Sequence, residues 1–198
     1  MKPTRRTSSI VALVVALLPP AVARGQQKPA DVKAAQAVNR DAQAIADFKT
    51  RVDEYVALRK KADDSAPPLK KTDQPRDIKE AQQGLVERIG AARSTAKQGD
   101  IFTPRLQQFI RTLLRPIFSG KDGLQIKNEI LDKEYKGEVK LAVNGRYPDE
   151  VPVSTMPPQV LAALPKLPEE IEYRFIQNNM ILFDPHAHII VDFMVRAF

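Results

Sequence analysis

The feature that most constrains this chain is a dense series of three apolar runs in its last third. The runs are rich in β-branched and aromatic residues, and they cover Glu172–Ile176, Met180–Asp184 and Ile189–Met194. Polar or proline-containing breaks, Gln177–Asn179 and Pro185–His188, separate them. Short apolar runs with such breaks are typical of an antiparallel β-meander. The stretch from Leu164 to Phe193 therefore predicts a small sheet as the centre of the fold.

The first 23 residues have the pattern of a secretory signal peptide. A basic start precedes an unbroken apolar run at Ile10–Leu18, and small residues at Ala21–Ala23 predict cleavage after Ala23. One alternative is an uncleaved membrane anchor, but the apolar run is shorter than the roughly 20 residues that a membrane span needs. The other is twin-arginine export through Arg5-Arg6. The chain has no cysteine, which excludes disulfides and a lipoprotein anchor. We expect a periplasmic or secreted protein with no membrane span after cleavage.

The net charge is modest once the signal peptide is set aside. The whole chain has a formal charge of +7, and residues 1–23 contribute three basic and no acidic residues. The remaining 28 basic and 24 acidic residues give +4 and are interspersed. No basic patch interleaved with aromatic residues appears, so we expect no nucleic-acid partner. Weak attraction to anionic envelope surfaces is the alternative to a simple solvated surface.

Two helical segments are predicted before the sheet. After a flexible mature N-terminus at 24–30, helical periodicity runs from Asp31 to about Ala62, with a narrow apolar seam formed by Val38, Ile45, Phe48, Val52 and Tyr55. A polar, proline-containing loop at 63–74 leads to a second helix at 77–96. We expect the seam to pack on the second helix, with dimerisation as the alternative. The predicted organisation is a helical hairpin at 31–98 and an α+β domain at 99–198.

Within the second unit, further helices are predicted to come before the meander. Thr103 as N-cap and Pro104 at the first position begin a helix that Pro116 ends or kinks near Arg115. Shorter helices are predicted at Leu124–Lys133 and at Pro158–Leu164, and the latter is expected to bury Val160, Leu161 and Leu164.

A tight turn is predicted at Asn144-Gly145, between strands at 139–143 and 146–153. Because helices dominate the first part and strands the last, the predicted fold class is α+β: an N-terminal helical hairpin and helices followed by a small antiparallel C-terminal sheet.

Several short motifs occur together between about Ile101 and Phe193. They include IFTPRL, VNGRYP, the proline-framed LPKLP and the later EYRF and IIVDF runs. This part of the chain resembles a group of uncharacterised exported proteins of Gram-negative and related bacteria, which implies a periplasmic protein of unassigned activity. Its end is also similar to the final strand pair of periplasmic nickel/cobalt-homeostasis proteins. Neither resemblance transfers a functional residue.

The clearest candidate for chemistry is the Asp184-Pro185-His186-Ala187-His188 segment, which holds both histidines of the chain. Histidines at i and i+2 of an extended segment project to one side, so His186 and His188 could hold one transition-metal ion with Asp184 or Asp192 as an oxygen ligand. The alternative interpretation is a solvated turn. Asp192 lies among apolar residues, so we expect it to be partly buried and hydrogen-bonded in a structural role rather than a catalytic one.

No motif for other catalytic chemistry is present, since no serine lies in a G-x-S-x-G elbow and no phosphate-binding glycine motif occurs. The sequence favours a non-enzymatic interaction or binding module with an envelope protein as partner and no cofactor. Two further hypotheses are transition-metal handling through the His186/His188 turn and a hydrolase assembled from scattered carboxylates.

Overall fold

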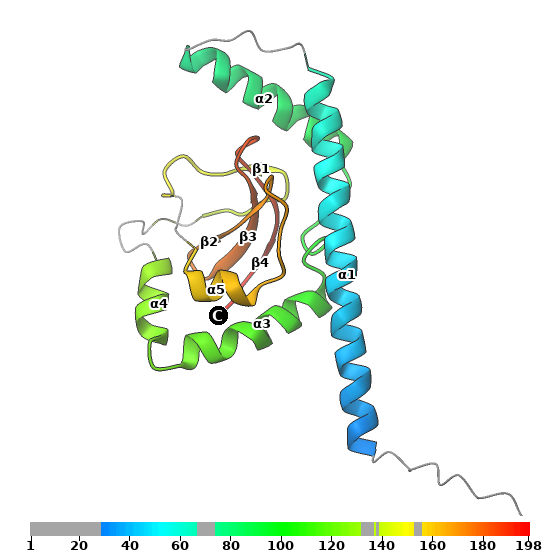
Figure 1. Cartoon of the computed structure of the whole chain (residues 1–198). Helices are drawn as coiled ribbons and strands as arrows, with labels where there is room; N and C mark the ends of the chain where they lie inside the picture. The colour runs from blue at the N-terminus through cyan, green and yellow to red at the C-terminus, as the bar shows by residue number, and fades with distance from the viewer. Residues whose placement is uncertain (1–28, 67–73, 132–136, 138, 153–155) are drawn as a thin grey trace, which may run out of the picture.

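The computed structural model describes residues 29–66, 74–131, 137, 139–152 and 156–198 (Figure 1). The helices in this part of the chain are α1 (Pro29–Asp64), α2 (Pro75–Ala92), α3 (Pro104–Ser119), α4 (Gly123–Ile130) and α5 (Pro158–Ala163). The strands are β1 (Gly145–Arg146), β2 (Glu172–Ile176), β3 (Asn179–Asp184) and β4 (Ile189–Met194). The predicted α+β class, with helices before a small antiparallel sheet, is confirmed. The predicted signal peptide, residues 24–28 and most of the 63–74 loop lie outside the described residues.

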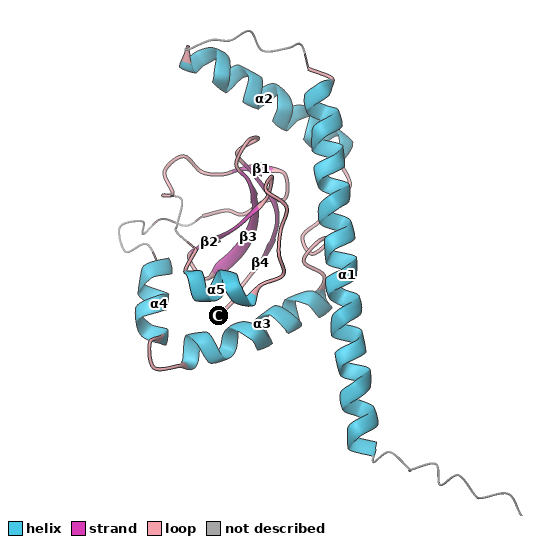
Figure 2. Ribbon diagram, in the orientation of Figure 1, coloured by secondary structure: helices cyan, strands magenta, loops and turns pink. Residues whose placement is uncertain are grey.

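The sheet has the strand order β1-β4-β3-β2, and every neighbouring pair is antiparallel (Figure 2). The predicted meander of β2, β3 and β4 is therefore confirmed. The predicted hairpin around Asn144-Gly145 is wrong, because β1 pairs with β4 instead. The Asn144 N–H donates to the Ile190 carbonyl at 2.9 Å, and the Tyr147 N–H donates to the His188 carbonyl at 2.9 Å. The apolar side chains before this turn pack on the sheet rather than forming a strand pair of their own.

Both faces of the sheet are covered, by different parts of the chain. One face carries Tyr173 and Phe175 into a core shared with side chains of α1, α2, α3 and α5, as the alternation of side chains along a strand requires. The other face packs against the 139–151 segment, centred on Tyr147. A β-bulge opposite Leu182/Phe183 interrupts the alternation of β4.

As a result, Val191 belongs to the first core cluster, whereas Phe193 belongs to the second. These two residues would share a face in a regular strand, but the bulge adds one residue to β4 and reverses the alternation after it.

Helix α3 begins as predicted but does not end where Pro116 predicts. The Thr103 hydroxyl accepts a hydrogen bond from the Leu106 N–H at 3.4 Å, with Pro104 at the first position of the helix. The helix then continues through Pro116 to Ser119. The last turn is stabilised from outside the helix, because Phe118 is buried and its ring stacks on Phe198 with centroids 4.3 Å apart. Tertiary packing therefore outweighs the loss of one backbone hydrogen bond.

The long helix α1 is buried only in its second half. Phe48, Val52 and Tyr55 lie in the main core, whereas Val38 is 69% exposed. The apolar seam predicted to include Val38 is therefore wrong at that end, because the start of α1 projects past the body of the molecule (Figure 1). On α5, Val160 is buried as predicted, but Leu161 is 52% exposed, which contradicts its predicted burial. No helix among the described residues is both long and apolar enough to span a membrane.

Candidate functional site

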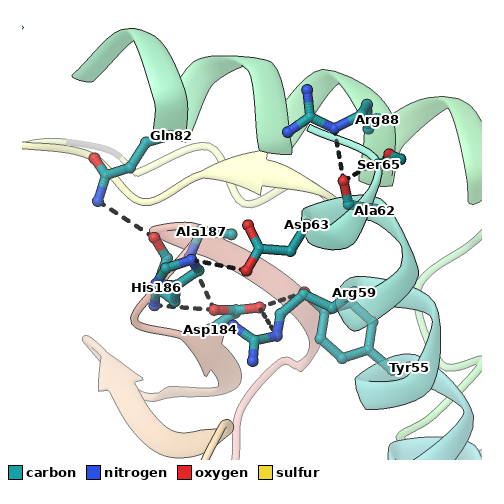
Figure 3. Close-up of polar contacts among 10 residues, drawn as sticks. All are labelled: Tyr55, Arg59, Ala62, Asp63, Ser65, Gln82, Arg88, Asp184, His186 and Ala187. Atoms are coloured by element: carbon teal, nitrogen blue, oxygen red, sulfur yellow. Dashed lines mark hydrogen bonds and ion pairs between the residues drawn. The ribbon is translucent and has the colours of Figure 1, made fainter. Parts of the chain in front are cut away.

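Among the described residues, two charged side chains are fully buried, Asp184 and Asp192. Asp184 ends β3 and connects the sheet to α1. Its Oδ2 accepts a hydrogen bond from the Tyr55 hydroxyl at 2.8 Å and lies 3.7 Å from Arg59 Nε (Figure 3). Its Oδ1 accepts the backbone N–H groups of His186 at 3.0 Å and Ala187 at 2.9 Å. The carboxylate thus fixes the β3–β4 turn and attaches α1 to it.

Tyr55, the hydrogen-bond donor to Asp184, is itself held in a protonated state. Burial raises the pKa of the Tyr55 hydroxyl, and the negative charge of Asp184 and the hydrogen bond to it raise the pKa further. The guanidinium of Arg93 lies over the Tyr55 ring, 5.0 Å from its centre. Because a phenol with a raised pKa keeps its proton, Tyr55 acts as a donor to Asp184 and not as a general base.

Arg93 extends this buried polar group to β4. Its Nη1 donates to Asn144 Oδ1 at 2.6 Å and to the Val191 carbonyl at 3.1 Å, while burial lowers the pKa of the guanidinium. Arg93 directly follows α2, so its contacts join α1, α2, the β1 turn and β4. The whole cluster therefore consists of groups that connect elements far apart in the sequence.

Asp192 accepts hydrogen bonds only from the backbone. Its Oδ1 accepts the N–H groups of Gly99 at 2.9 Å and Phe193 at 2.8 Å, and its Oδ2 accepts those of Ile101 and Phe102, both at 2.8 Å. Gly99 has a φ of +87°, a conformation that few residues other than glycine adopt readily. The prediction that Asp192 is buried and hydrogen-bonded is confirmed, and its carboxylate fixes the loop before α3.

The two histidines point to different parts of the molecule. His186 is exposed, and its Nε2 lies 3.5 Å from Asp63 Oδ2 at the end of α1 (Figure 3). His188 has a φ of +57°, and its Nε2 lies 3.7 Å from Asp149 Oδ1 in the loop after β1. Its ring contacts the rings of Tyr147 and Phe183 edge-on, so His188 is half-buried rather than part of a fully solvated turn.

No group of three or more His, Cys, Asp or Glu side chains that could hold a metal ion occurs in the described part of the chain. The oxygens of Asp184, the predicted third ligand, already accept hydrogen bonds from Tyr55 and from two backbone N–H groups. The metal site at His186 and His188 therefore stays a prediction, and the geometry supplies no third ligand for it.

A groove between α5 and β2 is a concave feature that the sequence did not predict. It has a volume of about 740 Å³. Its apolar lining consists of Met156, Pro158, Leu161, Ala162, Pro165, Leu167, Ile171 and Tyr173, and its charged residues are Lys166, Glu169, Glu172 and Arg174. The hydroxyl of Tyr173 donates to the Pro165 carbonyl at 3.0 Å, which holds the proline-rich segment against β2. In the sequence, the closely spaced prolines at 157–168 were the one signal of this groove, because they indicate a stiff, partly exposed apolar segment.

Neither a protein-family profile, a curated protein nor a solved structure matches this chain. The resemblance to exported bacterial proteins stays a prediction, and the function has to be argued from the chain itself.

Proposed function

We propose that this chain is an exported, non-catalytic interaction module that binds an extended apolar segment of a partner protein in the groove between α5 and β2. The observation that carries the proposal is the groove itself, a space of about 740 Å³ with eight apolar lining residues. Leu161 lines it with half of its surface exposed, although leucine at this point of an amphipathic helix is ordinarily buried. Exposed apolar surface of this kind is typical of a protein-binding site.

The charges of the groove favour a peptide over a small ion. Its lining contains two basic and two acidic residues, and Glu172 and Arg174 form an ion pair with each other. The groove therefore presents no surplus charge to attract an anionic or cationic ligand. It runs beside β2, which is an edge strand of the sheet, so an extended segment is the shape that fits along it.

The buried polar residues support a non-catalytic role. A catalytic carboxylate has to reach a substrate, but Asp184 and Asp192 are both fully buried and accept hydrogen bonds that connect secondary-structure elements. The export part of the proposal is supported by the signal-peptide pattern in residues 1–23. It predicts a mature chain that begins at Arg24, which intact-mass measurement of protein recovered from the cell envelope would test.

The groove is tested with a random 12-residue peptide library displayed on phage, selected against the purified protein. Selected peptides are then labelled and titrated by fluorescence anisotropy. We expect apolar sequences, and we expect Leu161→Asp to weaken their binding at least tenfold. The matched control is Leu124→Asp, which makes the same change at an exposed leucine on α4 outside the groove. Equal binding by both variants, or selection of charged peptides only, would contradict the proposal.

A further inference from the structure

A second pocket lies between the last turns of α3, helix α4 and the final residues of the chain, at the corner where Figure 1 marks the C-terminus. It has a volume of about 320 Å³. Its charged lining residues are Arg111, Arg115, Lys127 and Arg196, and no aspartate or glutamate lines it. The four cations come from three separate segments, so they form no patch within any one stretch of the sequence.

The cations of this pocket have no carboxylate side chain as an ion-pair partner among the described residues. Elsewhere, Arg59, Arg76, Arg105, Arg146 and Arg174 each form an ion pair with a carboxylate. Within the described residues, none of the four pocket cations forms such a pair. Arg111 is held in place by neutral oxygens, since its Nη2 donates to the Val195 carbonyl at 2.8 Å and its Nε to the Arg196 carbonyl at 3.1 Å. No carboxylate side chain of the described residues therefore competes with an outside anion for these four cations.

Exposed apolar residues stand next to these cations. Leu124 is 77% exposed and lies one helical turn before Lys127 on α4, so the two side chains share a face of that helix. Val195, beside Arg196, is 38% exposed. The stacked rings of Phe118 and Phe198 also line the pocket. A free anion would gain nothing from Leu124 or Val195, whereas a lipid surface offers both a phosphate for the cations and an apolar interior for these side chains.

We propose that this corner of the molecule docks on an anionic lipid surface, with a lipid phosphate in the pocket and Leu124 inserted beside it. The surface is distinct from the groove at α5 and β2, so the module can contact a membrane and a protein partner together. Each Lys or Arg near an anionic surface contributes roughly fivefold in affinity, and the attraction weakens as salt screens it. A local cluster can therefore direct binding although the net charge of residues 24–198 is only +4.

The test is flotation of the purified protein with phosphatidylcholine vesicles and with vesicles containing one quarter phosphatidylglycerol. We expect binding to the anionic vesicles only, decreasing with added salt. The variant Arg115→Gln/Lys127→Gln should lower the affinity at least tenfold, while Arg111 is left unchanged because it holds two carbonyls. The matched control is Lys60→Gln/Lys79→Gln, which removes the same charge from exposed positions on α1 and α2 and should change the affinity less than twofold.

Further variants separate this site from the alternatives. Leu124→Ser should weaken vesicle binding, and Leu161→Asp in the groove should leave it unchanged, so the two surfaces can fail independently. Equal losses in the pocket and control variants would mean that net charge alone drives binding, and this would overturn the proposal. Calorimetric binding of inorganic phosphate without any preference for anionic vesicles would also overturn it, in favour of a free-anion site. Circular dichroism melts of all variants establish that each is folded.

Discussion

Replacing Asp184 by alanine should remove the attachment of α1 to the sheet. The carboxylate is fully buried and accepts hydrogen bonds from the Tyr55 hydroxyl and from the N–H groups of His186 and Ala187. Its loss also leaves Arg59, whose side chain is 15% exposed, without its ion-pair partner. Removing one partner of a buried ion pair costs about 3–5 kcal/mol, a large share of the roughly 5–15 kcal/mol that stabilises a domain.

Urea titration followed by circular dichroism measures this loss. With a slope of about 1–3 kcal/mol per M urea, the midpoint should fall by at least about 1 M. Tyr55→Phe removes a single hydrogen bond to a charged group and should cost about 1.5–3 kcal/mol. In a double-mutant cycle, the combined variant should lose less stability than the sum of the two single variants, because both changes remove the same bond.

Asp63→Ala is the matched control, since Asp63 lies in the same region and contacts His186 but is about half exposed (Figure 3). Its replacement should change the free energy of unfolding by no more than about 0.5 kcal/mol. A similarly small effect of Asp184→Ala would refute the argument that the buried carboxylate holds α1 against the sheet.

Three further changes probe the core, the loop before α3 and the pH dependence. Phe175→Ala should cost about 3–5 kcal/mol in urea titration, whereas His186→Ala, at an exposed position, should cost no more than about 0.5 kcal/mol; a reversed order would contradict the described core. Asp192→Asn replaces one oxygen of a carboxylate that accepts four backbone N–H groups by an NH2 group, which is a donor. The free energy of unfolding should therefore fall by at least about 2 kcal/mol, and amide exchange at 99–102 should accelerate. Unchanged exchange would count against the carboxylate's role. Burial, and then the positive charge of Arg146, lower the pKa of His188 despite the opposing effect of Asp149, so the unfolded chain binds the proton more readily than the folded one. His188 therefore makes its full contribution to the free energy of unfolding above its pKa in the unfolded chain, which is about 6.5. This contribution is lost as the pH falls below that value. His188→Asn, which tolerates the positive φ, should reduce the loss of stability between pH 7.5 and 5; an unchanged loss would refute this assignment.

Local patterns in the sequence were sufficient to predict the elements that depend on neighbouring residues. The three runs from Glu172 to Met194 form the meander, and Thr103-Pro104 begins α3. These predictions succeeded because apolar runs bounded by turn residues, and helix caps, are set by residues a few positions apart. The fold class followed for the same reason, since it depends on the order of such elements along the chain.

Features that depend on distant residues could be decided only by the tertiary structure. Pro116 stays inside α3 because Phe118 packs on Phe198, 80 positions further along the chain. Of the strand predicted at 146–153, Arg146 lies in β1, which pairs with the edge of β4 that β3 leaves open.

The two candidate surfaces have different origins. The groove is lined by one continuous stretch, Met156–Arg174, and packing decides how α5 and β2 face each other across it. The basic pocket collects side chains from three separate segments, so no sequence window contains enough of them to form a pattern. Local propensity acts over a few residues, whereas a site of this second kind is produced by packing that brings remote residues together. For this chain, the sequence alone therefore determined the meander and the helices, and the tertiary structure decided which of their side chains meet at a surface.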